Sequence, residues 1–227
     1  MTAPKPFDDA ERYMEEIRLL IPGYYALHAM VPAVLGAAVA PIERVLAVGC
    51  GPALEAVAIA RAFPGCVVDA IDPSPAMAEA ARRTVAAAAM EEAIVVHAAT
   101  LAELRIDRPY DAAIVLLVGH LIPDDGARAS FLRDLGRAVR PRGVVVLAEL
   151  EDVGPARALL TEAHLRCSHA AGVLDERLET MRERLTSGFH AITRERLVTL
   201  LDDAGLSVKA ELFRAFGIVG LVLERGA

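Results

Sequence analysis

Short apolar runs alternate along the chain with longer segments that have the spacing of helices. Five of these runs are almost wholly apolar, which is typical of strands buried on both faces. The predicted strands are Arg44–Val48, Cys66–Ile71, Ala93–His97, Ala112–Leu117 and Val144–Leu150. Helical spacing occurs between them at Leu54–Phe63, Pro75–Met90 and Asp125–Val139, with a short turn at Leu101–Leu104. The alternation predicts a parallel, doubly wound α/β sheet with right-handed crossovers.

The first forty residues depart from this alternation. Pro22, Gly23 and Pro32 interrupt a helical pattern there, which predicts a helical cap over the sheet at about residues 1–40.

The segment after Leu150 departs from it as well. A long helical stretch with a break at Gly172 predicts a helical insertion at about residues 155–190. Thr193 and Gly205 have the residue types expected at the start and the end of a further helix.

The last two predicted strands, Ser207–Phe213 and Phe216–Glu224, are so close that they should form an antiparallel hairpin at one sheet edge. The 227 residues are enough for one domain with a sizeable core. We therefore expect a single domain over residues 1–227: a Rossmann-like, mostly parallel seven-stranded sheet at about 42–227, with the carboxyl-terminal hairpin and the amino-terminal cap.

Composition narrows the class of protein. No apolar run approaches the ~20 residues that a membrane-spanning helix needs, and the acidic start MTAPKPFDDAERYMEE lacks the features of a signal peptide. We expect a cytoplasmic protein without a membrane segment. A net charge of −7 disfavours direct nucleic-acid binding.

Cysteine and histidine usage gives no sign of a metal site. Three cysteines without a CxxC pair predict reduced thiols instead of a disulfide framework or a zinc ribbon. His164, Cys167 and His169 do not share one helix face, so we expect no metal.

The stretch VLAVGCGPALEA, residues 45–56, predicts a strand, a glycine turn and the start of a helix. Gly49 and Gly51 let the backbone turn tightly and approach a ligand, although a turn without a ligand would need the same residues. Asp72 follows about 20 residues later at the end of the next strand, the separation at which an acid reaches a ribose. Asp69 is the rival acid. Together these features indicate a cofactor that contains adenosine.

The order of the motifs resembles that of the class I S-adenosylmethionine-dependent methyltransferases. It comprises VLAVGCGPA, AIDPSPAM, YDAAIVLLVGHLIPD, FLRDLGRAVRPRGVVVLAE and LVTLLDDAGL before the hairpin, and covers about Ile42 to Glu224. Within that superfamily the chain is most similar to the carboxy-S-adenosylmethionine synthases of tRNA uridine modification. The residues that carry this similarity are Ile21-Pro22-Gly23-Tyr24, Ile71 to Met77, Ala204-Gly205-Leu206 and Phe213 to Phe216.

The resemblance implies S-adenosylmethionine, or its carboxylated form, as cofactor. The residues expected to bind it are Gly49, Cys50, Gly51, Asp72, Pro73, Met77, Thr100, Leu101 and Leu117. Three positions depart from the family pattern: Ala47 and Thr100 stand where relatives have acids, and Ala53 stands where many have a third glycine. The lost acid at position 47 is expected to lower affinity, and Ala53 to cost a little space.

Three residues are catalytic candidates through the same resemblance, and each has a plainer alternative. His120 lies at the tip of the fourth strand and is a candidate general base or a capping residue. Tyr24 closes over a substrate or packs in the cap. Arg182 binds a carboxylate, of the modified cofactor or of an acidic substrate, or forms a salt bridge with Glu179 or Glu183.

The resulting hypothesis is methyl transfer from S-adenosylmethionine to a small molecule. The molecule is acidic if Arg182 binds a carboxylate of the substrate. Two alternatives stay open: synthesis of carboxy-S-adenosylmethionine, and a non-catalytic cofactor-binding or interaction protein. These residues do not identify the methyl acceptor or the oligomeric state. A homodimer stays open.

Overall fold

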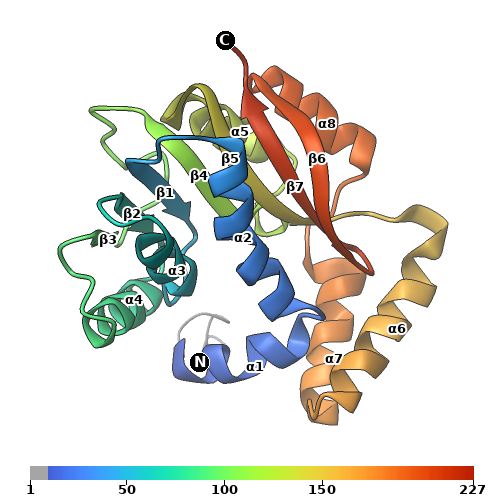
Figure 1. The fold of residues 1–227 in the computed structure, drawn as a ribbon. Coiled ribbons are helices and arrows are strands. Elements are labelled where there is room, and N and C mark those ends of the chain that lie inside the picture. Colours follow the sequence, from blue (N-terminus) through green and yellow to red (C-terminus); the bar gives the residue numbers. More distant parts are fainter. Residues whose placement is uncertain (1–9) are drawn as a thin grey trace.

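The computed structural model describes residues 10–227, with side chains from Glu15 onward. Its centre is a seven-stranded sheet with the order β3-β2-β1-β4-β5-β7-β6 (Figure 1). The strands are β1 Arg44–Val48, β2 Val67–Ile71, β3 Ile94–His97, β4 Tyr110–Leu116, β5 Val139–Leu150, β6 Leu206–Ala215 and β7 Ile218–Arg225. The first five strands pair in parallel, and β7 pairs antiparallel with both β5 and β6. The predicted α/β architecture with its carboxyl-terminal hairpin is confirmed.

Helices cover both faces of the sheet. The longer ones are α1 Ala10–Leu20, α2 Tyr24–Ala38, α3 Leu54–Ala62, α4 Pro75–Ala87, α5 Ala127–Ala138, α6 Arg157–Ala170, α7 Asp175–Glu183 and α8 Arg194–Asp203. One apolar cluster joins α2, α3 and α4 to one face of the sheet, and a second joins α5 and α8 to the other. No helix in this described part of the chain has the length and apolarity needed to cross a bilayer.

The predicted cap divides into two helices with different positions. Helix α2 packs on a sheet face through Val31 and Leu35, whereas α1 contacts α4 and α6. Figure 1 shows α1, α6 and α7 grouped on one side of the sheet. The division of the chain into domains stays a prediction, and residues 1–9 of the expected cap lie outside the described residues.

The strand order reverses between β1 and β4, because the chain leaves β1 toward β2 and β3 and returns on the other side. In open α/β sheets ligands bind at this switch point, beyond the carboxyl ends of the strands. The boundary of β5 differs from the prediction: the strand begins at Val139, because Val139 already pairs with Tyr110 before the Pro141-Arg142-Gly143 segment.

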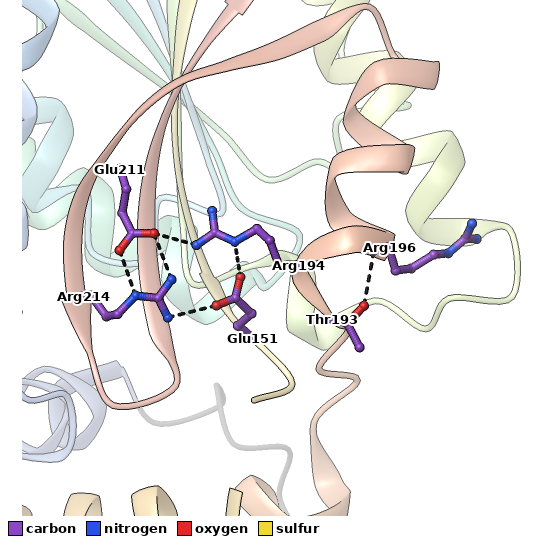
Figure 2. Close-up of polar contacts among 6 residues, drawn as sticks. All are labelled: Glu151, Thr193, Arg194, Arg196, Glu211 and Arg214. Carbon is purple, nitrogen blue, oxygen red and sulfur yellow. Dashed lines mark hydrogen bonds and ion pairs between the residues drawn. The ribbon is translucent and has the colours of Figure 1, made fainter. Parts of the chain in front are cut away.

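An ion-pair network holds the hairpin against the rest of the fold (Figure 2). Glu151, just after β5, pairs with Arg194 at the start of α8 and with Arg214 on β6, whose Nη1 lies 2.9 Å from Glu151 Oε2. Glu211 on β6 also pairs with both arginines. Thr193 caps α8 as predicted, because its hydroxyl accepts the backbone N–H of Arg196.

Candidate functional site

A cavity of about 830 Å³ opens at the switch point, a size within the range of about 300–1,000 Å³ typical of small-molecule sites. Its floor is formed by the ends of β1, β2 and β4 and the turns after them. Its roof is formed by α1, α7 and the turn that follows α7. The lining includes Ile17, Leu20, Ile21, Gly49, Gly51, Asp72, Met77, Leu117, Val118, His120, Met181, Arg184, Leu185 and Phe189.

The glycine turn after β1 has the conformation that its sequence requires. Gly49 and Gly51 have φ values of +63° and +49°. A Cβ at Gly49 would lie 2.4 Å from Val118 Cγ2, so a side chain there would push the floor of the cavity aside. Ala53 has a φ of +61°, so the third glycine position is a left-handed one. Its methyl group therefore introduces backbone strain as well as occupying space.

Asp72 lies at the tip of β2 and lines the cavity. One carboxylate oxygen accepts the N–H of Gly51 at 2.9 Å and the other accepts the N–H of Ser74 at 2.9 Å. Each oxygen keeps a lone pair for a ligand hydroxyl. Burial raises the pKa of Asp72, while the two N–H groups oppose that shift.

Asp69, the rival acid, lies elsewhere on the same strand. It bonds to His97, Tyr110 and Arg44 and does not line the cavity. Strand alternation therefore predicted which of the two acids lies at the tip of β2, while the role of Asp72 toward a ribose stays a prediction.

Other residues expected to bind the cofactor divide into two groups. Pro73, Met77 and Leu117 line the cavity, whereas Cys50, Thr100 and Leu101 do not. The Cys50 side chain belongs to the apolar cluster under α3, and the Leu101 side chain belongs to the cluster on the other face. The Thr100 hydroxyl donates to Glu103 Oε2 at 2.8 Å and is exposed.

Ala47 also faces away from the cavity. Its side chain is buried in the same apolar cluster as Val45 and Ile59. The expected loss of a cofactor contact through the missing acid is therefore not supported by this geometry.

His120 lies on the floor, in the short 3₁₀ turn Gly119–Leu121 that follows β4. The residue is only 7% exposed, and its ring meets the ring of Phe189 edge to face, with centroids 4.6 Å apart. Burial, together with the charge of Arg128, lowers its pKa to about 3, so the imidazole is neutral at physiological pH. Among the described residues none hydrogen-bonds to the ring, and its Nδ1 atom is buried without a partner.

The structure corrects two of the catalytic candidates. Tyr24 is buried in a small apolar cluster with Ile21 and Ile218, and its ring packs against the tilted ring of His28 with centroids 3.9 Å apart, so it packs inside the cap. Arg182 points away from the cavity, because its guanidinium pairs with Glu162 and Glu179.

Two other arginines of the insertion line the cavity instead. Arg177 pairs with Glu16 of α1. Arg184 begins the π-helical turn Arg184–Gly188, and no described residue forms a hydrogen bond or an ion pair with its guanidinium. Burial and the charge of Arg177 lower the pKa of Arg184, while Glu16 opposes this shift.

Helical spacing contains a signal that would have found these residues. Arg177, Met181, Arg184 and Leu185 follow one another at steps i, i+4, i+7 and i+8, which is one helix face, and all four line the cavity. Arg182 lies on another face. The resemblance that indicated Arg182 contains no information on which face of the helix lines the cavity.

Comparison with known proteins agrees with this geometry. Residues 45–143 match the family described as "Methyltransferase domain". A carboxy-S-adenosyl-L-methionine synthase of Shewanella loihica is 25% identical over 95% of this chain and 90% of its own length.

Solved structures share the fold. A methyltransferase of Burkholderia thailandensis, solved with 1,6-didemethyltoxoflavin and S-adenosylhomocysteine bound, covers all of this chain and 94% of its own, with a TM-score of 0.61 and 18% identity. The mitomycin 7-O-methyltransferase MmcR has a TM-score of 0.66 and 19% identity over 88% of this chain. This chain spans about half of MmcR's length, 53%.

The fold, the glycine turn and the match of residues 45–143 define the class: this is an enzyme with the fold of the S-adenosylmethionine-dependent methyltransferases. Within that class, the whole chain is similar to carboxy-S-adenosyl-L-methionine synthases. S-adenosylmethionine is the cofactor of the class, and Gly49, Gly51 and Asp72 fit it.

Proposed function

We propose that the chain transfers a methyl group from S-adenosylmethionine to a small molecule that carries an anionic group. One observation carries this proposal. A single cavity contains the glycine turn with Asp72 on its floor and Arg184 in its roof. The Arg184 guanidinium forms no hydrogen bond or ion pair with a described residue, although the charge of Glu16 acts on it. A cation that lacks a bonded partner in a largely apolar cavity favours a ligand that brings the negative charge.

The residues of the chain would share the work as follows. Gly49 and Gly51 offer backbone groups to the methionine part, and Asp72 accepts the ribose hydroxyls. Bound S-adenosylmethionine supplies a methyl group on a positively charged sulfur, so the protein mainly aligns the acceptor and excludes water.

His120 and the roof complete the site. The neutral imidazole of His120 can accept a hydrogen bond from the acceptor, whereas a pKa lowered to about 3 makes it a weak base for full proton transfer. The apolar side chains of α1 and α7 exclude water, and Arg184 orients the acceptor through its anionic group. The identity of the acceptor and the formation of a homodimer stay predictions.

Synthesis of carboxy-S-adenosylmethionine is the second candidate, and the curated relatives favour it. The modified cofactor carries an extra carboxylate. In this chain Arg184, instead of Arg182, would be the residue that binds it. Cofactor binding without catalysis is the third candidate, and the free ring of His120 argues against it.

Intact mass spectrometry of the ligand retained by the purified protein separates the candidates. S-adenosylmethionine or S-adenosylhomocysteine supports methyl transfer, and a species heavier by a carboxyl group supports the second candidate. A protein that binds neither compound, even at millimolar supply, contradicts both.

Arg184→Met and Arg182→Met are the matched variants for the anionic group. We expect R184M to lower affinity for carboxy-S-adenosylmethionine, or for the acceptor once it is identified, by about tenfold or more, since a charge-assisted hydrogen bond contributes about 1.5–3 kcal/mol. R182M should bind as the wild type does, because the Arg182 guanidinium of the wild type already pairs with two carboxylates outside the cavity. Equal effects of the two variants in calorimetry would contradict the assignment of Arg184.

A further inference from the structure

The turn Gly119–Leu121 is held from below by a buried carboxylate. Glu149 on β5 accepts the backbone N–H groups of Gly119 and His120. A Cβ on Gly119 would lie 1.9 Å from Glu149 Oε1, so the carboxylate lies directly against the backbone of the turn. Only glycine fits at position 119 while Glu149 holds this place.

The carbonyl side of the same turn is held by a buried guanidinium. Arg128 on α5 donates from Nη2 to the carbonyl oxygen of Gly119 at 2.6 Å and to that of Ile122 at 2.8 Å. The same nitrogen donates to the carbonyl oxygen of His190 at 2.5 Å. His190 in turn donates its N–H to the carbonyl oxygen of His120 at 2.8 Å. The floor and the roof of the cavity are therefore joined at His120.

Both side chains that make these contacts are buried, which is energetically costly for charged groups. Glu149 is 4% exposed and Arg128 is 1% exposed, although charged side chains are almost never fully buried. Glu149 Oε2 and Arg128 Nη1 have no hydrogen-bond partner among the described residues. Stability alone explains such a pair poorly, because apolar side chains of similar volume often serve a core as well or better.

Burial raises the pKa of Glu149 to about 7, and Arg128 and the two N–H groups oppose that shift. The two side chains instead determine where the His120 ring lies. The turn that they hold carries His120, and the His190 segment that Arg128 holds carries Phe189, which packs against the His120 ring. Glu149 interacts with the positive charge of Arg128 and with the backbone N–H of His120.

We propose that Glu149 and Arg128 are positioning residues that fix the His120 ring at the cavity floor, with Glu149 holding the N–H groups and Arg128 the carbonyl groups of its turn. This geometric role stands for any reaction in the cavity. Its consequence for the alignment of the acceptor rests on the proposed function.

Nitrogen-15 NMR of the histidine rings tests the proposal without an acceptor. The variants are Glu149→Gln and Arg128→Lys, and the His120 signals are assigned by their loss in His120→Asn. In the wild type we expect a neutral His120 ring throughout pH 5–8. In E149Q and R128K the His120 ring signals should shift or broaden, because the turn Gly119–Leu121 loses part of the hydrogen bonding that holds its backbone.

Asp111→Asn is the matched control. Asp111 is also a buried carboxylate that accepts two backbone N–H groups, from Glu43 and Arg44, and pairs with an arginine. It lies at the opposite end of the sheet. D111N should lower the melting temperature but leave the His120 ring signals and S-adenosylhomocysteine affinity as in the wild type.

Folded E149Q and R128K with wild-type His120 signals would overturn the proposal. If neither variant folds, amide hydrogen exchange of the wild type tests the proposal. The amides of Gly119 and His120 should then be protected like those of β4. Rapid exchange of these two amides would overturn the proposal. Failure of the wild type to bind S-adenosylhomocysteine would contradict the proposed function instead, and the ring signals would still test the positioning role.

Discussion

Asp69 and Asp72 show how much the position of a single side chain decides. Both acids come from one short segment and both are largely buried, yet their partners differ. Hydrogen bonds from His97, Tyr110 and Arg44 outweigh burial and lower the pKa of Asp69, so its charge is already neutralised within the fold. Asp72 accepts only backbone N–H groups and faces the cavity.

Replacing Asp72 should therefore affect the cofactor, and replacing Asp69 should not. We expect Asp72→Asn to weaken binding of S-adenosylhomocysteine at least about tenfold, because a charged acceptor of the ribose hydroxyls is lost. Asp69→Asn should lower stability and leave the affinity within about twofold. Isothermal calorimetry measures both, and equal affinities for D72N and the wild type would contradict the ribose assignment.

Residue types at fixed spacing could be predicted from the sequence, whereas side-chain direction could not. Gly49, Gly51 and Asp72 were found because a strand, a turn and a strand end fix their backbone positions. Tyr24 and Arg182 failed because the neighbours that engage them, such as His28 and Glu162, come from packing that no local pattern contains.

At the scale of elements, the network in Figure 2 joins segments that the sheet alone would leave loosely attached. Glu151 receives Arg194 from the start of α8 and Arg214 from β6. Its side chain is buried between these two partners.

Removing that charge should loosen the edge of the fold. We expect Glu151→Gln to lower the free energy of unfolding by about 1–3 kcal/mol, since it leaves two partly buried arginines with Glu211 alone. Lys209→Met, which removes an exposed pair with Glu224, should cost less than about 1 kcal/mol. Urea unfolding of both variants checks the difference, and equal losses would show that Glu151 is no more than a surface charge.

Most elements could be predicted because each has a local cause. Thr193 and Ser74 cap their helices through their own hydroxyls, and the apolar runs define the strands. The early start of β5 was missed because its pairing with Tyr110 is a long-range contact that the Pro141-Arg142-Gly143 segment conceals.

At the scale of the whole molecule, the cavity is closed by parts of the chain that are far apart in sequence. Helix α1 is tied to the insertion by Glu16 with Arg177 and by the carbonyl oxygen of Leu20, which accepts from His164 at 2.6 Å. The glycine turn and strand order could be predicted, but this roof could not, because helical spacing does not reveal which helices meet.

A ligand in the cavity should therefore protect both parts of the roof together. On addition of S-adenosylhomocysteine we expect slower amide exchange at residues 16–21 and 177–189, because a filled cavity holds the roof closed. Residues 194–203 of α8, on the other face of the sheet, serve as the internal control. Hydrogen-exchange mass spectrometry measures this, and protection confined to the floor would show that the roof does not respond to the cofactor.

The three cysteines differ in exposure, so a thiol-reactive dye can be attached beside the roof of the cavity. Cys50 and Cys66 are buried, and burial raises the pKa of both thiols, that of Cys66 to about 11, so they stay protonated and slow to react. Cys167 is exposed on α6. A maleimide dye should therefore label the native chain at one position, on the helix that anchors the roof, and report its opening without any engineered cysteine.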